Sequence, residues 1–174
     1  MYEILSSESH SRESEAKCIE KKETMIEIHS NLKDALKDLK ARCNNPTQIV
    51  FDIDGTLLVG KNPVHLLCMY YRNICARSNC EVKLLTARPC NMYENTTKQL
   101  KKNGLDIFDE LIMKNVNISE TEAIFKRRLI KELNPQISIG NRWHDLNVQD
   151  DVEIDHLPDD QYVVGEGWLK MPTT

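Results

Sequence analysis

The sequence predicts an α/β protein whose mainly parallel, Rossmann-like sheet is flanked by helices. Short apolar runs rich in β-branched residues, such as residues 48–53 and 82–85, have the length and composition of buried strands. Between these runs lie longer segments whose apolar residues recur every three or four positions, which is typical of helices packed on one face. Strands that alternate with helices of this length indicate βαβ units. A chain of 174 residues is long enough for one such domain.

The elements are predicted in chain order as follows. Residues 1–23 are polar and are expected to form a flexible N-terminal arm. An amphipathic helix that packs on the core is predicted within residues 24–46; Thr24 and Glu27 have the spacing of a capping box, and Pro46 follows its end. The α/β domain then spans residues 47–174. Its strands are expected at 48–53, 82–85, 111–113, 137–139 and 162–164, and its helices from Asn62-Pro63 to about residue 78, from Pro89 to Asn103-Gly104, and at 120–133.

Composition limits the class of protein. Hydrophobic residues make up 40% of the chain and charged residues 29%, a globular balance that excludes collagen-like and fully disordered chains. No run approaches the roughly 20 apolar residues of a membrane span, and the first residues lack the basic-then-apolar order of a secretory signal. We therefore expect a cytoplasmic protein with no membrane partner and with reduced cysteines. The cysteines include no C-x-x-C pair, so a structural zinc site is not expected.

The net charge of −4 is unevenly distributed. Residues 98–102 and 126–131 are basic, whereas residues 145–160 contain seven acidic residues and no Lys or Arg. The basic runs indicate either solvated helix faces or a local patch for an anionic polymer such as nucleic acid. The sequence does not predict the oligomeric state.

Polar residues that suit phosphate chemistry follow three of the predicted strands, where ligands of parallel sheets bind. Asp52 and Asp54 stand two residues apart, so their charges repel unless a cation or a proton lies between them. Mg²⁺, which prefers oxygen ligands, is suited to that position. Carboxylates, hydroxyls, a lysine and a metal ion together indicate phosphoryl transfer. The residues in question are Asp52, Asp54, Gly55 and Thr56 after the first strand, Thr86 and Arg88 after the second, and Gly140, Asn141 and Asp145 after the fourth.

Three segments resemble motifs of the haloacid dehalogenase superfamily. VFDIDGTLL (50–58) resembles the first motif, LLTARP (84–89) the second, and ISIGNRWHDL (137–146) the fourth. The stretch from 84 together with GNRWHD is also similar to plant acid phosphatases and vegetative storage proteins. The resemblance covers residues 48–165 and implies a capless fold, because neither insertion point has room for a separate cap domain.

The resemblance implies a role for each matching residue. Asp52 would be the nucleophile that forms an aspartyl-phosphate, and Asp54 the general acid and base. Thr86 would bind a phosphoryl oxygen. The phosphate-binding set would also include Gly55, Thr56, Ala87 and Arg88, and the Mg²⁺ ligands would be Asp52, Asp54, Asn141 and Asp145.

Two departures from the family pattern affect this assignment. Asn141 stands where the family usually has Asp, so one negative charge fewer would hold Mg²⁺, and Asp145 becomes the main acidic ligand expected after the fourth strand. The lysine of the third motif is ambiguous between Lys126, Lys114 and Lys131. Lys126 is favoured because a long cationic side chain in the first half of the helix at 120–133 can reach the strand ends.

These features predict a Mg²⁺-dependent phosphomonoesterase. Its substrate would be an exposed phosphate on a phosphoprotein or a nucleic-acid end, or an accessible small phosphomonoester, because a capless site is open. Two alternatives remain: a catalytically weak binding or storage protein, suggested by Asn141, and a phosphotransferase.

Overall fold

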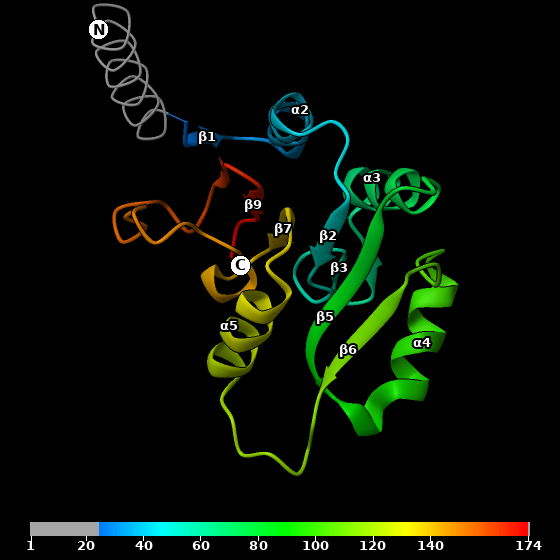
Figure 1. Cartoon of the computed structure of the whole chain (residues 1–174). Coiled ribbons are helices and arrows are strands. Elements are labelled where there is room, and N and C mark those ends of the chain that lie inside the picture. The colour runs from blue at the N-terminus through cyan, green and yellow to red at the C-terminus, as the bar shows by residue number, and fades with distance from the viewer. Residues whose placement is uncertain (1–24, 174) are drawn as a thin grey trace, which may run out of the picture.

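The computed structural model describes residues 25–173, in which a seven-stranded sheet has the order β1-β8-β9-β7-β2-β5-β6 (Figure 1). The strands of this sheet are β1 (Glu27–His29), β2 (Gln48–Phe51), β5 (Glu81–Pro89), β6 (Glu110–Lys114), β7 (Ile137–Gly140), β8 (Tyr162–Gly165) and β9 (Trp168–Lys170). A separate hairpin consists of β3 (Leu58–Val59) and β4 (Asn62–Pro63). The helices are α2 (Leu32–Arg42), α3 (His65–Cys75), α4 (Tyr93–Lys102) and α5 (Glu122–Leu133), with short 3-10 helices η1 (Cys90–Met92) and η2 (Trp143–Asp145).

The centre of the sheet is parallel. β2 pairs in parallel with β5 on one side and with β7 on the other, β6 extends the sheet beside β5, and β9 extends it beside β7. β8 is antiparallel to both of its neighbours, β9 and β1. The predicted α/β fold class with a mainly parallel sheet is therefore confirmed.

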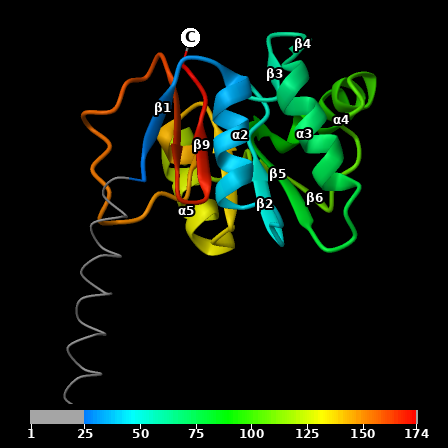
Figure 2. The same cartoon turned by 90° about the horizontal axis from the view of Figure 1, so that it is seen from above.

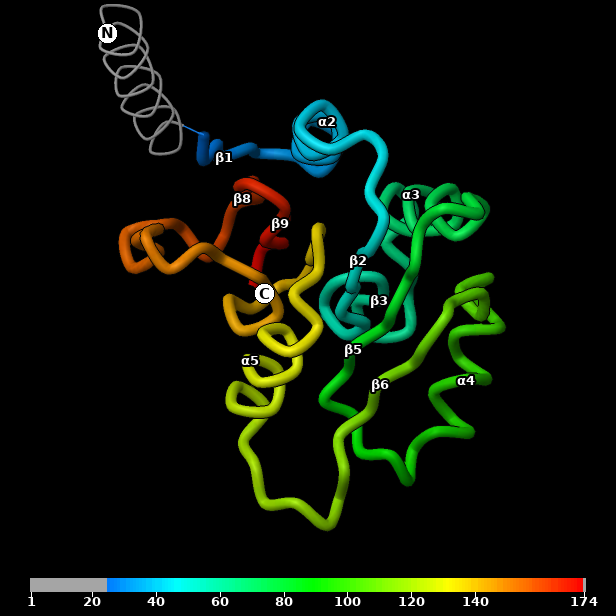
Figure 3. Tube along the Cα trace, in the orientation of Figure 1, coloured from blue at the N-terminus to red at the C-terminus, as the bar shows by residue number. Residues whose placement is uncertain are grey.

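Successive side chains of the central strands point to opposite faces of the sheet, and helices pack on both faces. Ile49 and Phe51 pack into a large core with residues of α2, α3 and α4, whereas Val50 packs with Phe125 and Ile130 of α5 on the other face. Figure 2 shows α2 and α5 on opposite sides of the sheet. Because β2 pairs in parallel with β5 and β7, the carboxyl ends of the three strands lie at one edge of the sheet. The chain path is easiest to follow in the tube of Figure 3.

The predicted N-terminal helix begins too early. Residues 27–29 form the edge strand β1 beside β8, and the helix starts only after Asn31, whose side chain accepts a hydrogen bond from Asp34 N at 2.9 Å. The proposed capping box of Thr24 and Glu27 is therefore wrong, because pairing with a distant strand overrides the local helical spacing. The predicted arm at residues 1–23 lies outside the described residues.

Three other elements differ from the prediction. Asn62-Pro63 forms strand β4 of a hairpin instead of opening a helix, because Val59 pairs with Asn62 and Leu58 with Pro63. β5 continues through Pro89, so Thr86, Ala87 and Arg88 lie within a strand. β9, which the sequence analysis missed, is inserted between β7 and β8.

None of the helices between Met25 and Thr173 has both the length and the apolar character required to cross a lipid bilayer.

Candidate active site

The residues after β2 form a tight turn at the carboxyl edge of the sheet. Asp52 N donates a hydrogen bond to Ile139 O of β7 at 2.9 Å, which fixes the start of the turn against the neighbouring strand. Gly55 has a φ of 77°, in the left-handed region that glycine adopts without strain. Its amide donates to Leu58 O at 2.7 Å, so the turn leads directly into the β3–β4 hairpin.

Asp52, Lys126 and Asp145 form a buried cluster of ionisable groups. Lys126 Nζ, on α5, lies 2.7 Å from Asp52 Oδ1 and 2.9 Å from Asp145 Oδ1. It also donates to the carbonyl oxygen of Leu85 at 2.7 Å, and its side chain is fully buried. Thr56 Oγ1 donates to the second Asp52 oxygen at 3.1 Å. Lys126 therefore links the middle of β5 to the residues that directly follow β2 and β7.

The electrostatics of this cluster follow from burial and from its opposite charges. Burial raises the pKa of Asp52 to about 7, although Lys126 and Thr56 favour the ionised form and oppose that rise. Burial lowers the pKa of Lys126, but the charges of Asp52 and Asp145 outweigh burial and raise it above its usual range. The lysine is thus a permanent cation beside a carboxyl group that titrates near neutral pH.

Of the three candidate lysines, Lys126 is the one placed against Asp52. Lys114 ends β6, which is separated from β2 by β5, and Lys131 is exposed in the last turn of α5.

Asp54 and Arg88 form a bidentate ion pair at the mouth of the site. Arg88 Nε and Nη2 donate to the two oxygens of Asp54 at 2.8 and 2.7 Å. The side chain of Asp54 is 55% exposed, so this carboxylate faces solvent, unlike Asp52. Arg88 Nη1 also donates to Thr96 Oγ1 of α4 at 3.3 Å. The pair thus ties the turn after β2 to β5 and α4.

The second-motif residues have different environments. Thr86 is buried, and its hydroxyl oxygen accepts a hydrogen bond from Arg88 N at 3.1 Å. The side chain of Ala87 packs against the apolar cluster around Phe125, on the α5 face of the sheet. Any contact of Ala87 with a phosphate would therefore use its backbone.

The fourth-motif loop directly follows β7 and carries Asn141 and Asp145. Arg142 N donates to Asp145 Oδ2 at 3.0 Å, and a Cβ on Gly140 would lie 2.2 Å from Asp145 Cβ, so Gly140 is required for this close approach. The amide group of Asn141 lies against Gly55, where a Cβ would be 2.2 Å from its Nδ2. Thr173 Oγ1 donates to the Asn141 carbonyl at 2.7 Å.

The oxygen groups at this edge suit a hard divalent cation. Asp52 and Asp145 supply carboxylates, and Asn141 supplies an amide oxygen. Asp145 Oδ1 is buried and, within residues 25–173, has an ion-pair contact with Lys126 but no aligned hydrogen bond. Asp54 can serve as a cation ligand only through its backbone carbonyl, because both of its side-chain oxygens accept hydrogen bonds from Arg88. A Mg²⁺ ion is therefore compatible with these donors, although Lys126 already offsets part of their charge.

Sequence analysis missed several residues that support the site. Thr96 holds Arg88, and Lys170 at the end of β9 donates to Thr173 Oγ1 at 3.2 Å. Lys170 is buried beside the ring of Trp143, and Trp143 itself packs edge-on against Trp168 with ring centroids 5.7 Å apart. The short, mainly apolar run at residues 168–171, bounded by Gly167 and Pro172, was the available signal for a strand, but nothing in the sequence places that strand beside β7.

Fold and site together define an α/β protein with a buried carboxylate–lysine centre at the carboxyl edge of a parallel sheet. No protein-family model matches the chain, and no curated protein matches it at a significant level. A chain in a solved structure of the Pnkp1/Rnl/Hen1 RNA repair complex is similar with a TM-score of 0.49 and 22% identity, covering 59% of this chain and 38% of that one. A chain in another structure of the Pnkp1/Rnl/Hen1 complex has a TM-score of 0.44 and 24% identity, covering 52% of this chain and 36% of that one. This chain thus spans less than two fifths of either neighbour's length.

Proposed function

We propose that this protein is a Mg²⁺-dependent phosphomonoesterase of the haloacid dehalogenase type that works through an aspartyl-phosphate. The observation that carries the proposal is the buried contact of Lys126 with both Asp52 and Asp145 at the edge where parallel sheets bind ligands. A fixed cation next to a carboxylate suits a phosphoryl group, whose transfer depends on positioning and charge stabilisation.

The residues would divide the reaction as follows. Asp52 attacks phosphorus, and the bond from phosphorus to the leaving-group oxygen breaks. Lys126 stabilises the negative charge on the phosphoryl oxygens, and the Thr56 and Thr86 hydroxyls orient them. The ionised form of Asp52 is the nucleophile, and Lys126 favours this form against the rise in pKa that burial causes.

Asp54 is suited to proton transfer because it is at the open mouth of the site. After taking up a proton from solvent, Asp54 would protonate the leaving alcohol, and the carboxylate so formed would take a proton from the water that cleaves the aspartyl-phosphate. For either step Asp54 must be released from Arg88, so we propose that substrate phosphate competes for the guanidinium and frees the carboxylate. Asp52, Asn141, Asp145 and the backbone carbonyl of Asp54 would hold Mg²⁺, which would supply further charge neutralisation at the phosphoryl group.

The test is hydrolysis of para-nitrophenyl phosphate with and without Mg²⁺, comparing the wild type with Asp52→Asn and with Asp106→Asn, an exposed acid remote in sequence from the motifs. Cation-dependent turnover that is lost only in Asp52→Asn, with acid-stable, hydroxylamine-sensitive phosphate on the wild-type protein, is the expected result. Turnover that survives in Asp52→Asn would overturn the nucleophile assignment. An added alcohol acceptor distinguishes a phosphotransferase, which would form a transfer product in place of free phosphate.

The alternative of a catalytically weak binding protein rests on Asn141. The side-chain amide nitrogen of Asn141 packs against Gly55, and Asn141 contributes no negative charge to the proposed cation site. Binding of inorganic phosphate without turnover of any phosphomonoester would favour this alternative.

A further inference from the structure

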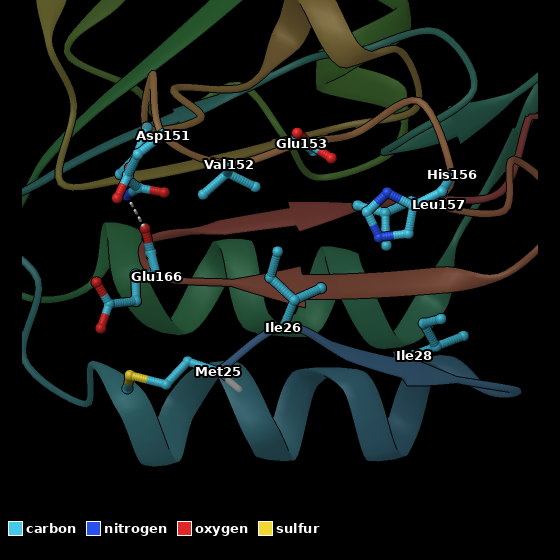
Figure 4. A pocket seen from close by; sticks show the side chains of 10 residues that line it. Met25, Ile26, Ile28, Asp151, Val152, Glu153, His156, Leu157 and Glu166 are labelled. Atoms are coloured by element: carbon cyan, nitrogen blue, oxygen red, sulfur yellow. Dashed lines mark hydrogen bonds between the residues drawn. The ribbon is translucent and has the colours of Figure 1, made fainter. Parts of the chain in front are cut away.

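A groove of about 580 Å³ lies at the β1 edge of the sheet, and none of its lining residues belongs to the candidate active site. Its apolar lining comes from the segment around β1 and from the loop between η2 and β8. Figure 4 shows Ile26 and Ile28 pointing from the β1 side toward the loop that carries Val152 and Leu157. Ile28 is 53% exposed, which is unusual for an isoleucine inside a strand.

The rim of the groove is strongly acidic. Residues 147–161 contain six acidic residues and no Lys or Arg. Asp151 and Glu153 of this loop line the groove together with Glu166 from the β8–β9 turn. Within residues 25–173, the acidic residues of this loop form a single ion pair, between Asp159 and Lys170 at 3.8 Å. The acids that line the groove are therefore not neutralised by the described part of the chain. Such a rim attracts positive charge.

The groove adjoins an open strand edge. Within the described residues β1 pairs with β8 alone, so backbone groups on its other side are free to pair with an added strand. Added strands gain affinity from backbone hydrogen bonds and specificity from alternate side chains.

We propose that this groove binds an extended segment of a partner protein as an extra strand beside β1. Every second side chain of this strand would point into the groove, and these groove-facing side chains would be apolar and basic in turn. The apolar side chains would contact Ile28, Val152 and Leu157 in the groove. The basic side chains would pair with Asp151 and Glu153 at the rim. This surface is separate from the carboxylate–lysine centre and is independent of the proposed phosphatase activity.

The experiment uses the full chain and fluorescence anisotropy with labelled peptides. The probe, the Lys–Val peptide, has Val and Lys in turn at every second position and Thr at the positions between, so that both side chains can face the groove. It is compared with a Glu–Val peptide, in which Glu replaces Lys, and with a Lys–Val peptide interrupted by Pro, which cannot pair as a regular strand. We expect the Lys–Val peptide to bind, and its affinity to fall as the salt concentration rises. Both comparison peptides should bind at least about tenfold more weakly. Bound Lys–Val peptide should slow amide hydrogen exchange at residues 27–29.

Variants locate the binding surface. Asp151→Lys combined with Glu153→Lys, both at exposed positions, and separately Ile28→Asp should each weaken binding at least about tenfold. Asp106→Lys and Ile107→Asp, exposed before β6, are the matched controls and should leave binding unchanged.

Several results would overturn the proposal. One is the absence of binding up to roughly 1 mM peptide, a concentration that corresponds to a binding free energy of about −4 kcal/mol. Another is binding of the Glu–Val peptide or the Pro-containing peptide that is as tight as binding of the Lys–Val peptide. The third is a loss of binding in the control variants equal to that in the groove variants. Dimerisation of the protein that is abolished by Ile28→Asp, seen by sedimentation equilibrium, would assign the groove to a second copy of the chain instead.

Discussion

Replacing Lys126 by Met tests whether the buried lysine is a charged partner of Asp52. Met has a similar length and leaves no large void, so the main change is the loss of a cation 2.7 Å from Asp52 and 2.9 Å from Asp145. At an effective dielectric constant of about 20, one contact at this distance corresponds to about 6 kcal/mol of Coulomb energy, which is an upper limit. Breaking a buried ion pair by removing one partner typically costs about 3–5 kcal/mol.

The pH dependence of this loss gives the sharper test. Because the pKa of Asp52 is raised to about 7 in the folded protein, ionising Asp52 opposes folding: this cost is absent below about pH 4 and grows as pH rises to about 7. Without Lys126 the pKa of Asp52 rises further, so the variant continues to lose stability above pH 7, by about 1.4 kcal/mol per pH unit, while the wild type does not. We therefore expect a loss of about 2 kcal/mol at pH 6 and about 4 kcal/mol at pH 8.5.

Urea unfolding in EDTA at both pH values measures these losses. Lys131→Met, at an exposed position on the same helix, is the control and should change the free energy of unfolding by less than about 0.5 kcal/mol. A loss from Lys126→Met that is equal at pH 6 and pH 8.5, or that stays below about 1 kcal/mol, would refute the assignment of Lys126 as the charge that holds Asp52.

Three further substitutions probe the turn and the fourth-motif loop. Gly55→Ala should lower the free energy of unfolding by at least about 1–2 kcal/mol and reduce activity, because it strains a φ of 77° and drives a Cβ into Asn141. Gly60→Ala is the control in the same unfolding assay: its φ of 62° is also left-handed, but open space surrounds it, so it measures the backbone strain alone. Asn141→Asp should tighten Mg²⁺ binding measured by calorimetry, and a large gain in turnover with it would favour the catalytically weak alternative. Thr173→Val should weaken Mg²⁺ binding about tenfold by releasing the Asn141 carbonyl, whereas Thr173→Ser should not, and equal binding by both would contradict a positioning role.

The central strands were predictable because they are short, apolar and bounded by turn residues. β2 and β7 appear within one or two residues of their predicted positions. β1 was not predictable, because Met25, Ile28 and Leu32 continue a helical spacing and only the distant partner β8 decides against it. Short edge strands contribute few residues, so local sequence carries little information about them.

The candidate site divides in the same way. The motif residues after β2 and β7 were found from sequence because they directly follow recognisable strands. Lys126 was favoured among three lysines from its place in the predicted helix, but its contact with Asp52 needed the helix's placement on the sheet. The pairing of Asp54 with Arg88 needed the extended end of β5. Lys170 was missed because its role depends on Thr173 and Trp143, which approach it only after β9 is inserted beside β7.

A structural explanation of the Asp52–Lys126–Asp145 cluster is weaker than a functional one on energetic grounds. Buried ion pairs contribute little net stability, because the desolvation of each charge offsets their attraction, and an apolar set of the same volume is often more stable. Here one lysine must compensate two carboxyl groups, and one of them has a pKa displaced to about 7. Ionisation of Asp52 opposes folding at neutral pH, and ligands bind where the carboxyl ends of parallel strands meet. The cluster therefore agrees with the proposed binding of a phosphoryl group and a cation, which would add to its interactions.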